Sequence, residues 1–348
     1  SLVPSVADST FRINNFNKIS FAFDYKTSLH KYIRKASVNL ALKSLDGLDA
    51  GVIGFEKKSN NDRTRMYTFL KAMLRDMPQD MVYLINRGEW GYRQLNSAVH
   101  VGMEHTYKYK RGTGNILMNV RTSAFTNDYD FSSGSICAVN RNDLGKININ
   151  TRVFGQIGFG NKLPSESMLF VAGANNEELM DNKYTRSMGI VPPNWGGYGS
   201  TTNHFTAGGG LNLRGYSGYI LPQKNVDGTY TYNYKGITGA AFNTEIEFGE
   251  LFKVINPKFL KNSIKFQPYL FGDAGIINTN KPGTANVMSD LMVDAGAGAT
   301  FSIVRWGPLY NIKPLTIRFD CPFFINRLPY AEKDYFQFRW MLGINKAF

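Results

Sequence analysis

Apolar and polar residues alternate along most of this chain, in segments of about ten residues that are separated by turns. Because successive side chains of a strand point to opposite faces, the alternation predicts β-strands with one apolar face and one polar face. The pattern occurs in residues 19–25, 32–42, 50–56, 95–107, 116–124, 132–140, 147–159, 238–248, 263–276, 291–303, 315–319 and 336–344. We therefore predict an all-β fold of about twelve antiparallel strands.

Composition favours a membrane barrel over a soluble sheet protein. The chain has 25 Phe, 19 Tyr and 34 Gly, which suits aromatic girdles at the membrane surfaces and glycine-rich turns. No stretch approaches the roughly twenty apolar residues that a spanning helix needs. The mean hydropathy of −0.27 fits strands that alternate between lipid and lumen. We predict one transmembrane antiparallel β-barrel domain over residues 1–348.

Two segments depart from the alternation. Residues 63–77 place apolar side chains at helical spacing, which predicts one short amphipathic helix that packs against the loops, with a methionine-rich partner surface as the alternative. The apolar positions of this segment are Met66, Phe69, Leu70, Met73, Leu74 and Met77. Residues 160–234 are rich in Gly, Asn, Tyr and Pro and far exceed an ordinary loop, so we predict a long extracellular loop there.

Sequence motifs of catalysis and metal binding are missing. The chain contains no His-Glu-x-x-His, no Gly-x-Ser-x-Gly and no phosphate-binding loop. His100 and His105 fall on opposite faces of one predicted strand, so they do not share a metal ion. Cys137 and Cys321 lie in separate strands and form neither a disulfide framework nor a metal site. We expect no enzyme activity, no cofactor and no bound metal.

The formal net charge of +13 comes from lysine and arginine scattered through turns and polar strand faces. Nucleic acid is disfavoured as a partner, because no basic helix and no aromatic-basic stacking module accompanies the charge. Attraction to anionic lipid headgroups and hydrogen bonding inside the lumen account for it better.

A short motif in the long loop and a second motif in a later strand stand out from the alternation. Leu213-Arg214-Gly215-Tyr216 follows three glycines, and Phe271-Gly272-Asp273-Ala274-Gly275 lies in a predicted strand about sixty residues later. The alternation points Asp273 and Glu245 into the lumen. A guanidinium inside a barrel would need a paired acceptor, and inward-facing carboxylates can supply it.

These two segments, with a strand that ends the chain, resemble the C-terminal barrel of the Omp85 superfamily. The resemblance is specific over residues 208–348 and implies a barrel of about sixteen strands in the bacterial outer membrane. It also implies that the extracellular loop folds back into the lumen, where its arginine meets carboxylates of the next strands. On this resemblance we predict that Arg214 bonds Asp273, with Glu245 as a second acceptor. The loop-pinning residues that it implies are Arg214, Gly215, Tyr216, Glu245, Phe271, Asp273 and Gly275.

The last strand resembles the terminal signal recognised by the outer-membrane assembly machinery. It alternates aromatic residues and ends in Phe, but Lys346 stands where an apolar residue is expected. Glycine in a strand weakens packing, so we predict that the seam between this strand and the first strand, near residues 19–25, is the least stable in the barrel. The residues of this terminal seam are Phe336, Phe338, Trp340, Gly343 and Phe348.

The Omp85 resemblance implies insertion or translocation of polypeptides, with outer-membrane lipid, lipopolysaccharide, client polypeptides and other outer-membrane or periplasmic subunits as partners. Two other functions are open: a passive porin, and a barrel that anchors or assembles with a periplasmic or surface domain. The chain starts at Ser1 with neither an initiator Met nor a signal segment. We therefore expect it to be the C-terminal part of a longer protein, in which strands or periplasmic domains precede Ser1.

Overall fold

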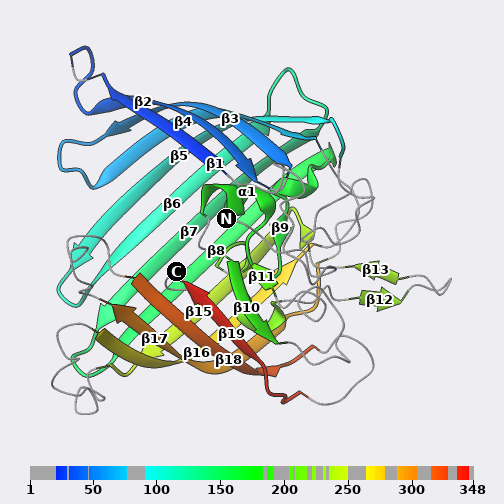
Figure 1. Ribbon diagram of the computed structural model, residues 1–348. Coiled ribbons are helices and arrows are strands. Elements are labelled where there is room, and N and C mark those ends of the chain that lie inside the picture. The colour runs from blue at the N-terminus through cyan, green and yellow to red at the C-terminus, as the bar shows by residue number, and fades with distance from the viewer. Residues whose placement is uncertain are drawn as a thin grey trace, which may run out of the picture.

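A computed structural model shows an all-β protein dominated by one large antiparallel sheet (Figure 1). The structure describes residues 21–29, 31–45, 47–76, 91–182, 186–190, 204–206, 208–217, 222–224, 230–232, 235–249, 264–278, 288–303, 315–327 and 335–344. Thirteen strands in these ranges form a continuous wall. They are β1 (Phe21–Ser28), β2 (Ala36–Leu45), β3 (Leu48–Lys58), β4 (Thr64–Arg75), β5 (Leu95–Tyr109), β6 (Gly112–Ser123), β7 (Asp130–Asp143), β8 (Asn148–Lys162), β15 (Gly239–Glu247), β16 (Ile264–Ile277), β17 (Met292–Ile303), β18 (Leu315–Ile325) and β19 (Trp340–Ile344).

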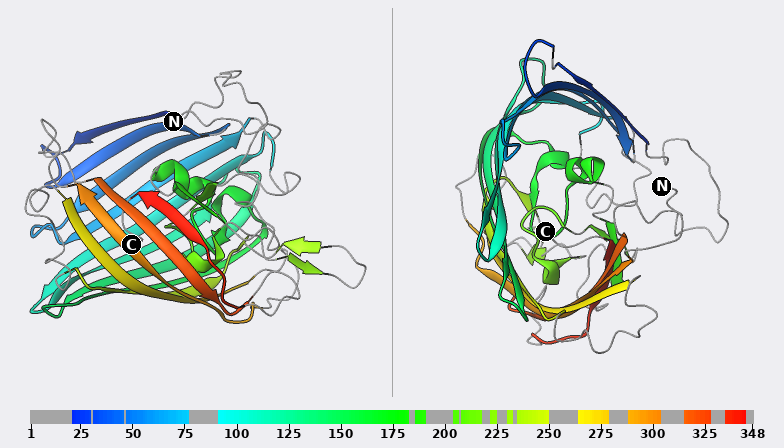
Figure 2. Two further views of the ribbon diagram at one scale, coloured as in Figure 1. Left: turned by 60° about the horizontal axis from the view of Figure 1, so that its bottom comes forward. Right: turned by 90° about the vertical axis from the view of Figure 1, so that its left-hand side faces the viewer.

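Short elements connect β8 to β15 and form the long loop that the sequence predicts. They are η3 (Ser165–Ser167), β9 (Leu169–Phe170), α1 (Asn176–Asp181), β10 (Arg186–Ile190), β11 (His204–Thr206), η6 (Arg214–Tyr216), β12 (Pro222–Lys224), β13 (Tyr230–Tyr232) and β14 (Lys235–Gly236). In the right-hand view of Figure 2 the wall curves into an incomplete ring, with α1 inside it. The predicted entry of this loop into the lumen is therefore seen for the part of the loop that carries α1 and η6.

Neighbouring wall strands are neighbours in sequence, except that β8 pairs with β15 across the long loop. The turn between β5 and β6 is short, as is the turn between β7 and β8, and both lie at the end of the wall opposite the long loop. The two-residue turn between β2 and β3 lies at the other end, so short turns occur at both ends of the wall.

The outer face of the wall is apolar in every strand. Each wall strand exposes at least one large apolar side chain, which suits contact with lipid. One such residue from each strand, in order from β1 to β19, is Phe23, Leu42, Ile53, Leu70, Val101, Val120, Ile136, Val153, Phe242, Leu270, Phe301, Phe319 and Leu342. Among the described residues, no helix has both the length and the apolar character needed to cross a membrane.

The predicted helix over residues 63–77 is wrong, because Thr64–Arg75 forms wall strand β4. Its apolar residues serve two faces: Met66 and Leu70 point outward and are exposed, whereas Met73 is buried among loop residues in the lumen. A strand that is apolar on both faces loses its alternation, and its spacing then imitates a helix. This added strand raises the predicted count of about twelve to thirteen.

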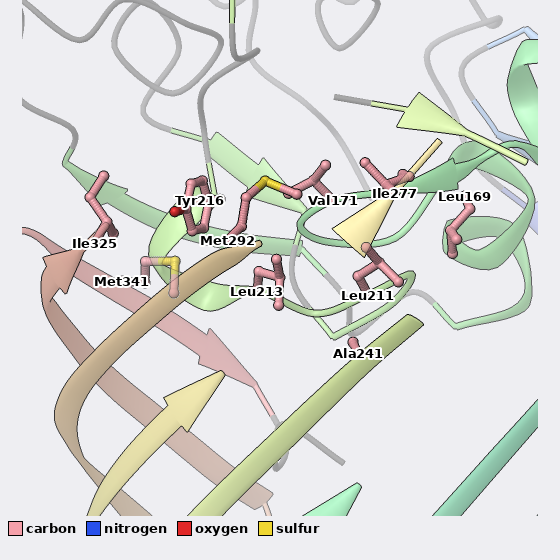
Figure 3. Close-up of a cluster of buried hydrophobic side chains, with 10 residues drawn as sticks. All are labelled: Leu169, Val171, Leu211, Leu213, Tyr216, Ala241, Ile277, Met292, Ile325 and Met341. Atoms are coloured by element: carbon pink, nitrogen blue, oxygen red, sulfur yellow. The ribbon is translucent and has the colours of Figure 1, made fainter. Parts of the chain in front are cut away.

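A hydrophobic cluster fills the lumen beside the C-terminal strands (Figure 3). It joins loop residues next to η6 with inward-facing residues of β15, β16, β17 and β19 and of the end of β18. Its members are Leu169, Val171, Leu211, Leu213, Tyr216, Ala241, Ile277, Met292, Ile325 and Met341. A second cluster packs α1 residues Leu179 and Met180 on β2, β3 and β4. The lumen is packed with side chains at these two places.

The predicted seam between the last and the first strand is not seen in the described residues. We expected β19 to pair with the first strand, but in the described residues β19 pairs with β18 on one side and with β10 of the long loop on the other. The sheet order continues from β10 to β11, and β1 forms the opposite end of the sheet. Strand β1 is exposed along all eight of its residues. The partner of the last strand is therefore a loop segment.

Candidate functional site: the anchors of the lumen loop

Arg214 lies inside the wall and binds both predicted carboxylates. Its Nε donates to Asp273 Oδ2 at 2.8 Å and its Nη2 donates to Asp273 Oδ1 at 2.9 Å. Its Nη1 donates to Glu245 Oε1 at 2.5 Å. The side chain of Arg214 is only 1% exposed, so the paired guanidinium is shielded from water. This bidentate geometry is the strongest form of arginine-carboxylate pairing.

The Arg214 backbone and ring contacts fix the position further. Its backbone N–H donates to Asp273 Oδ2 at 3.2 Å, so one carboxylate binds both the main chain and the side chain. The guanidinium carbon lies 3.9 Å from the centroid of the Phe271 ring, a close cation-π contact. We name Arg214, Asp273, Glu245 and Phe271 the arginine anchor.

Gly215 and Gly275 allow the loop to approach the wall closely. A Cβ atom at Gly215 would lie 2.3 Å from the Cβ of Asp294 on β17, and real Cβ contacts are not that short. At Gly275 a Cβ atom would lie 3.0 Å from the carbonyl oxygen of Ala240 and 3.2 Å from a methyl of Leu213. Glycine is needed at Gly215 because its α-carbon packs directly on β17.

Tyr216 holds the end of η6 against the next two strands. Its buried ring joins the hydrophobic cluster of Figure 3, and its hydroxyl donates to Asn326 Oδ1 at 2.8 Å. The same amide oxygen accepts the backbone N–H of Val293 at 2.7 Å. Every residue of the loop-pinning set that the sequence predicts therefore lies at one place, where the loop meets β15, β16 and β17.

Burial and charge act in opposite directions on Arg214. Burial alone would lower the pKa of Arg214, but the carboxylates of Asp273 and Glu245 raise that pKa well above its ordinary value. The guanidinium is therefore permanently charged, and the anchor cannot be released by deprotonation of Arg214.

Two residues of the neighbouring strands extend the arginine anchor, and the sequence did not single them out. Arg152 on β8 donates from Nη2 to the carbonyl oxygen of Gly210 at 2.7 Å, and from Nη1 to Asn243 Oδ1 at 2.8 Å. Asn243 Nδ2 in turn donates to Asp273 Oδ1 at 3.1 Å and to the carbonyl of Asn212 at 3.0 Å. In register, Arg152, Asn243 and Asp273 form one row across three strands.

A second anchor holds α1 against the other half of the wall. Glu177 of α1 binds Lys71 of β4 at 3.1 Å and Arg121 of β6 at 2.9 Å. Asp181 at the end of α1 binds Lys71 at 3.1 Å and Lys43 of β2 at 2.9 Å. We name these five residues the helix anchor.

Nearby, η3 makes a separate contact with the same half of the wall. Arg75 Nε of β4 donates to Glu166 Oε1 at 2.8 Å, and both side chains are buried. Neither this contact nor the helix anchor is predicted from the sequence, for one reason. Lys71 and Arg75 lie in the segment that we predicted as a helix, so their inward direction was not deduced.

Glu177 is ionised in this setting. Burial by itself raises the pKa of Glu177, but the ammonium of Lys71 and the guanidinium of Arg121 outweigh it and hold the pKa well below its ordinary value. Glu178 has the opposite shift, because burial raises its pKa more than two backbone hydrogen bonds lower it. Glu178 completes a capping box with Asn175 at the start of α1 and accepts the N–H of Gly210 at 3.3 Å, which links the two anchors.

A cavity of about 620 Å³ lies beside the helix anchor, between α1 and the inner faces of β2, β3 and β4. Lys43, Lys71 and Asp181 line it together with Glu56 and Arg65. Among the described residues, no group of three or more His, Cys, Asp or Glu side chains is arranged to hold a metal ion. The charged groups of the helix anchor bind one another.

The predicted terminal strand is seen in part. Phe336, Phe338 and Leu342 are exposed on the outer face, whereas Met341 is buried in the lumen cluster. Trp340 and Gly343 lie in β19, and their register partners in β10 are Ile190 and Ser187. Phe348 and Lys346 lie outside the described residues.

Comparison with solved structures shows the fold. The chain is similar to the crystal structure of BamA from Haemophilus ducreyi lacking POTRA domains 1-3, with a TM-score of 0.51 and 13% sequence identity. This match covers 94% of the chain and 62% of the BamA chain. CdiB from Escherichia coli matches with a TM-score of 0.45 at 12% identity, over 93% of this chain and 49% of CdiB. The chain spans less than two thirds of the length of both proteins.

Porins give similar matches. OprD from Pseudomonas aeruginosa matches with a TM-score of 0.43 at 10% identity, over 92% of this chain and 68% of OprD. No protein-family model matches the chain. No curated protein sequence matches it either. The fold is that of an outer-membrane β-barrel, and together with the lipid-facing outer surface it supports the predicted location in the bacterial outer membrane.

Proposed function

We propose that this chain is an Omp85-type outer-membrane barrel that inserts polypeptides into the outer membrane or translocates them across it. The arginine anchor is the observation that carries the proposal. Arg214 stands at the tip of a loop that folds into the lumen, and it binds carboxylates of the next two strands, Glu245 and Asp273. That arrangement is what the resemblance to the superfamily implies for these residues. A loop pinned inside the lumen argues against a permanently open pore.

The proposed activity requires no covalent chemistry. The wall would offer main-chain hydrogen bonds to an extended client, and the anchored loop would keep the lumen closed while the client passes. Outer-membrane lipid and lipopolysaccharide are the proposed surroundings, and client polypeptides are the proposed partners. No nucleic acid, cofactor or metal is part of the proposal.

Reconstitution tests the proposal. The full chain is placed in vesicles of outer-membrane lipid, and the folding of a second, unfolded β-barrel protein is followed by its heat-modifiable gel migration. We expect the chain to speed folding at least about tenfold over vesicles that hold an unrelated barrel, a change of about 1.4 kcal/mol in the barrier. Arg214→Ala should remove the acceleration. Arg93→Ala is the matched control, because Arg93 has a side chain that is 70% exposed, pairs only loosely with the exposed Asp76 at 3.7 Å, and belongs to neither loop anchor.

A passive porin is the second candidate, and the charged cavity beside α1 is the observation that favours it. Lys43, Arg65 and Asp181 line this space of about 620 Å³, which would suit a small ion or solute. Single-channel recording in a planar bilayer separates the two functions. A steady open conductance without any acceleration of barrel folding would establish the porin. Acceleration of folding with a closed baseline would reject it.

A further inference from the structure

The outer edge of β19 is occupied by a segment of the long loop. Residues of β10 pair antiparallel with β19 in the register Ser187 to Gly343, Met188 to Leu342, Gly189 to Met341 and Ile190 to Trp340. Strand β11 then pairs with β10 on its far side. Figure 1 shows β10 beside β19, at the end of the curved wall. The last wall strand therefore has two strand neighbours, and one of them is not part of the wall.

The ladder between β10 and β19 is short. It covers only Trp340–Gly343 of β19, whereas the ladder between β7 and β8 covers all 14 residues of β7. Each lost ladder position removes main-chain hydrogen bonds and cross-strand contacts, so this pairing is weaker than the long pairings of the wall. The ladder between β18 and β19 is equally short, with four residue pairs. It is also made by a loop whose firm attachments lie elsewhere, at the helix anchor before β10 and at the arginine anchor after β11.

We propose that β10 is a resident strand that occupies a polypeptide-binding edge on β19, and that an extended client segment binds there by displacing β10. The inference rests on the proposed function and adds where the client binds and what it competes with. An unpaired strand edge pairs with almost any extended chain through main-chain hydrogen bonds. The pairing with β10 demonstrates that this edge accepts a strand from outside the wall.

The faces of β19 define the chemistry of the client. Leu342 and Ile344 are exposed on the outer face, whereas Met341 and Gly343 are buried on the lumen face. A strand bound at this edge continues both faces of the wall. Its alternate residues should therefore be large and apolar beside Leu342, and small or polar beside Gly343. The expected client is an extended polypeptide with period-two alternation, as in the wall strands of this chain.

A reversible disulfide between β10 and β19 tests the proposal in the full chain. Cys137→Ser and Cys321→Ser remove the native thiols, and one of two register pairs is then replaced by cysteine: Met188 with Leu342, or Gly189 with Met341. Adjacent register pairs alternate between the two antiparallel geometries, so one pair of the two is suited to a disulfide. Leu70 with Val99, paired between β4 and β5, is the control within the wall.

Peptide labelling is the readout. The probe is a synthetic peptide with the sequence of residues 182–191 of this chain and a photoreactive group. It is added to the protein in detergent or in vesicles at a concentration on the order of millimolar, so that it can compete with the tethered β10. We expect the oxidised β10–β19 pair to reduce labelling at least about tenfold, corresponding to about 1.4 kcal/mol. Reduction of the same sample should restore labelling, which excludes misfolding as the cause. Oxidation of the control pair should leave labelling unchanged.

A second variant acts in the opposite direction. Replacement of residues 184–192 by a glycine-serine segment of equal length should raise peptide labelling, because the resident strand is removed and both anchors are kept. The proposal is overturned if neither cysteine pair crosslinks while the control pair does, or if labelling is the same in the oxidised and reduced samples. This test does not involve insertion of a barrel. If labelling falls when the β10–β19 disulfide forms but the chain does not accelerate barrel folding, the proposed function is rejected and the strand-binding edge on β19 is supported.

Discussion

The two anchors of the long loop hold it by different physical means. The arginine anchor is a bidentate pair in which Arg214, Asp273 and Glu245 are all buried. The helix anchor uses a lysine at its centre, and one of its carboxylates, Asp181, has a side chain that is 52% exposed beside the cavity. A guanidinium fork fixes orientation, whereas an ammonium is a point charge that tolerates movement. We infer that the loop is positioned by Arg214 and that its helix anchor yields first.

Loss of Arg214 should have the largest effect of any single substitution, because it removes the stronger of the two anchors. Arg214→Ala leaves Asp273 and Glu245 buried without their cation, which costs about 3–5 kcal/mol of unfolding free energy. Urea unfolding in detergent micelles measures the loss. Arg214→Lys keeps the charge but not the fork and should recover only part of it. Equal unfolding free energies of the alanine variant and the native chain would show that the arginine anchor does not stabilise the fold.

Gly215→Ala tests the close approach of η6 to β17 without changing any charge. The new methyl group would lie 2.3 Å from the Cβ of Asp294, so backbone or strand must move, at a cost of about 1–3 kcal/mol. Gly134→Ala is the matched control. Its nearest neighbour would be a methyl of Val120 at 4.0 Å, and we expect a change within about 0.5 kcal/mol. Similar urea midpoints for both variants would contradict the packing described for η6.

Glu177→Gln tests the helix anchor, which we infer to be the weaker of the two. The substitution removes the carboxylate shared by Lys71 and Arg121, yet Lys71 keeps Asp181 and Arg121 keeps Ser133. We therefore expect a smaller loss, about 1–2 kcal/mol, and faster amide exchange in α1 with little change near Arg214. Asp62→Asn, at the exposed pair with Lys35, serves as the surface control and should leave exchange in α1 unchanged. Faster exchange at η6 than at α1 would reverse our ranking of the anchors.

A shift to pH 5 should have the smallest effect, because it leaves the helix anchor intact. The pKa of Glu177 is lowered in the folded chain, so its stabilising contribution is fully present above the ordinary pKa of glutamate, about 4.3, and is lost as pH falls through the folded value. That folded value is well below the ordinary one, so α1 should stay protected at pH 5. Amide exchange of α1 at pH 7 and pH 5, corrected for intrinsic rates, checks this. Deprotection at pH 5 would mean that Glu177 is not the controlling group.

Strand prediction from sequence succeeded where the inner face of the wall is polar. The segment at residues 147–159 alternates clearly, and it became β8. The segment at residues 63–77 failed because Phe69 and Met73 are apolar on the inner face, while Met66 and Leu70 are apolar toward lipid. Alternation reports the contrast between two environments, so it disappears where the lumen is packed with protein. One misassigned strand explains the difference between the predicted and observed strand numbers.

The candidate site was predictable in the same uneven way. Arg214 and its two carboxylates were predicted from the resemblance to the superfamily, and the alternation of two strands supported that prediction by placing both carboxylates on the inner face. Arg152 and Asn243 lie on inward positions of predicted strands, but only the register between β8 and β15 reveals that they meet Asp273. Register depends on pairing across the long loop, and one sequence does not specify it. The partner of β19 was mispredicted for this reason, since β10 is separated from β19 by about 150 residues and pairs with it through tertiary structure alone.

Attachment of the loop on both sides of β10 determines how strongly a client must compete. Strand β10 begins five residues after α1 ends, and η6 follows β11 after seven intervening residues. A segment tethered so closely never leaves the neighbourhood of β19, and short tethers give effective concentrations on the order of millimolar. A free peptide at micromolar concentration would rarely displace β10. A client that is delivered to the barrel and held nearby would compete with β10 at a similar effective concentration. Selectivity for delivered clients would then arise from the tether itself, without any sequence-specific pocket.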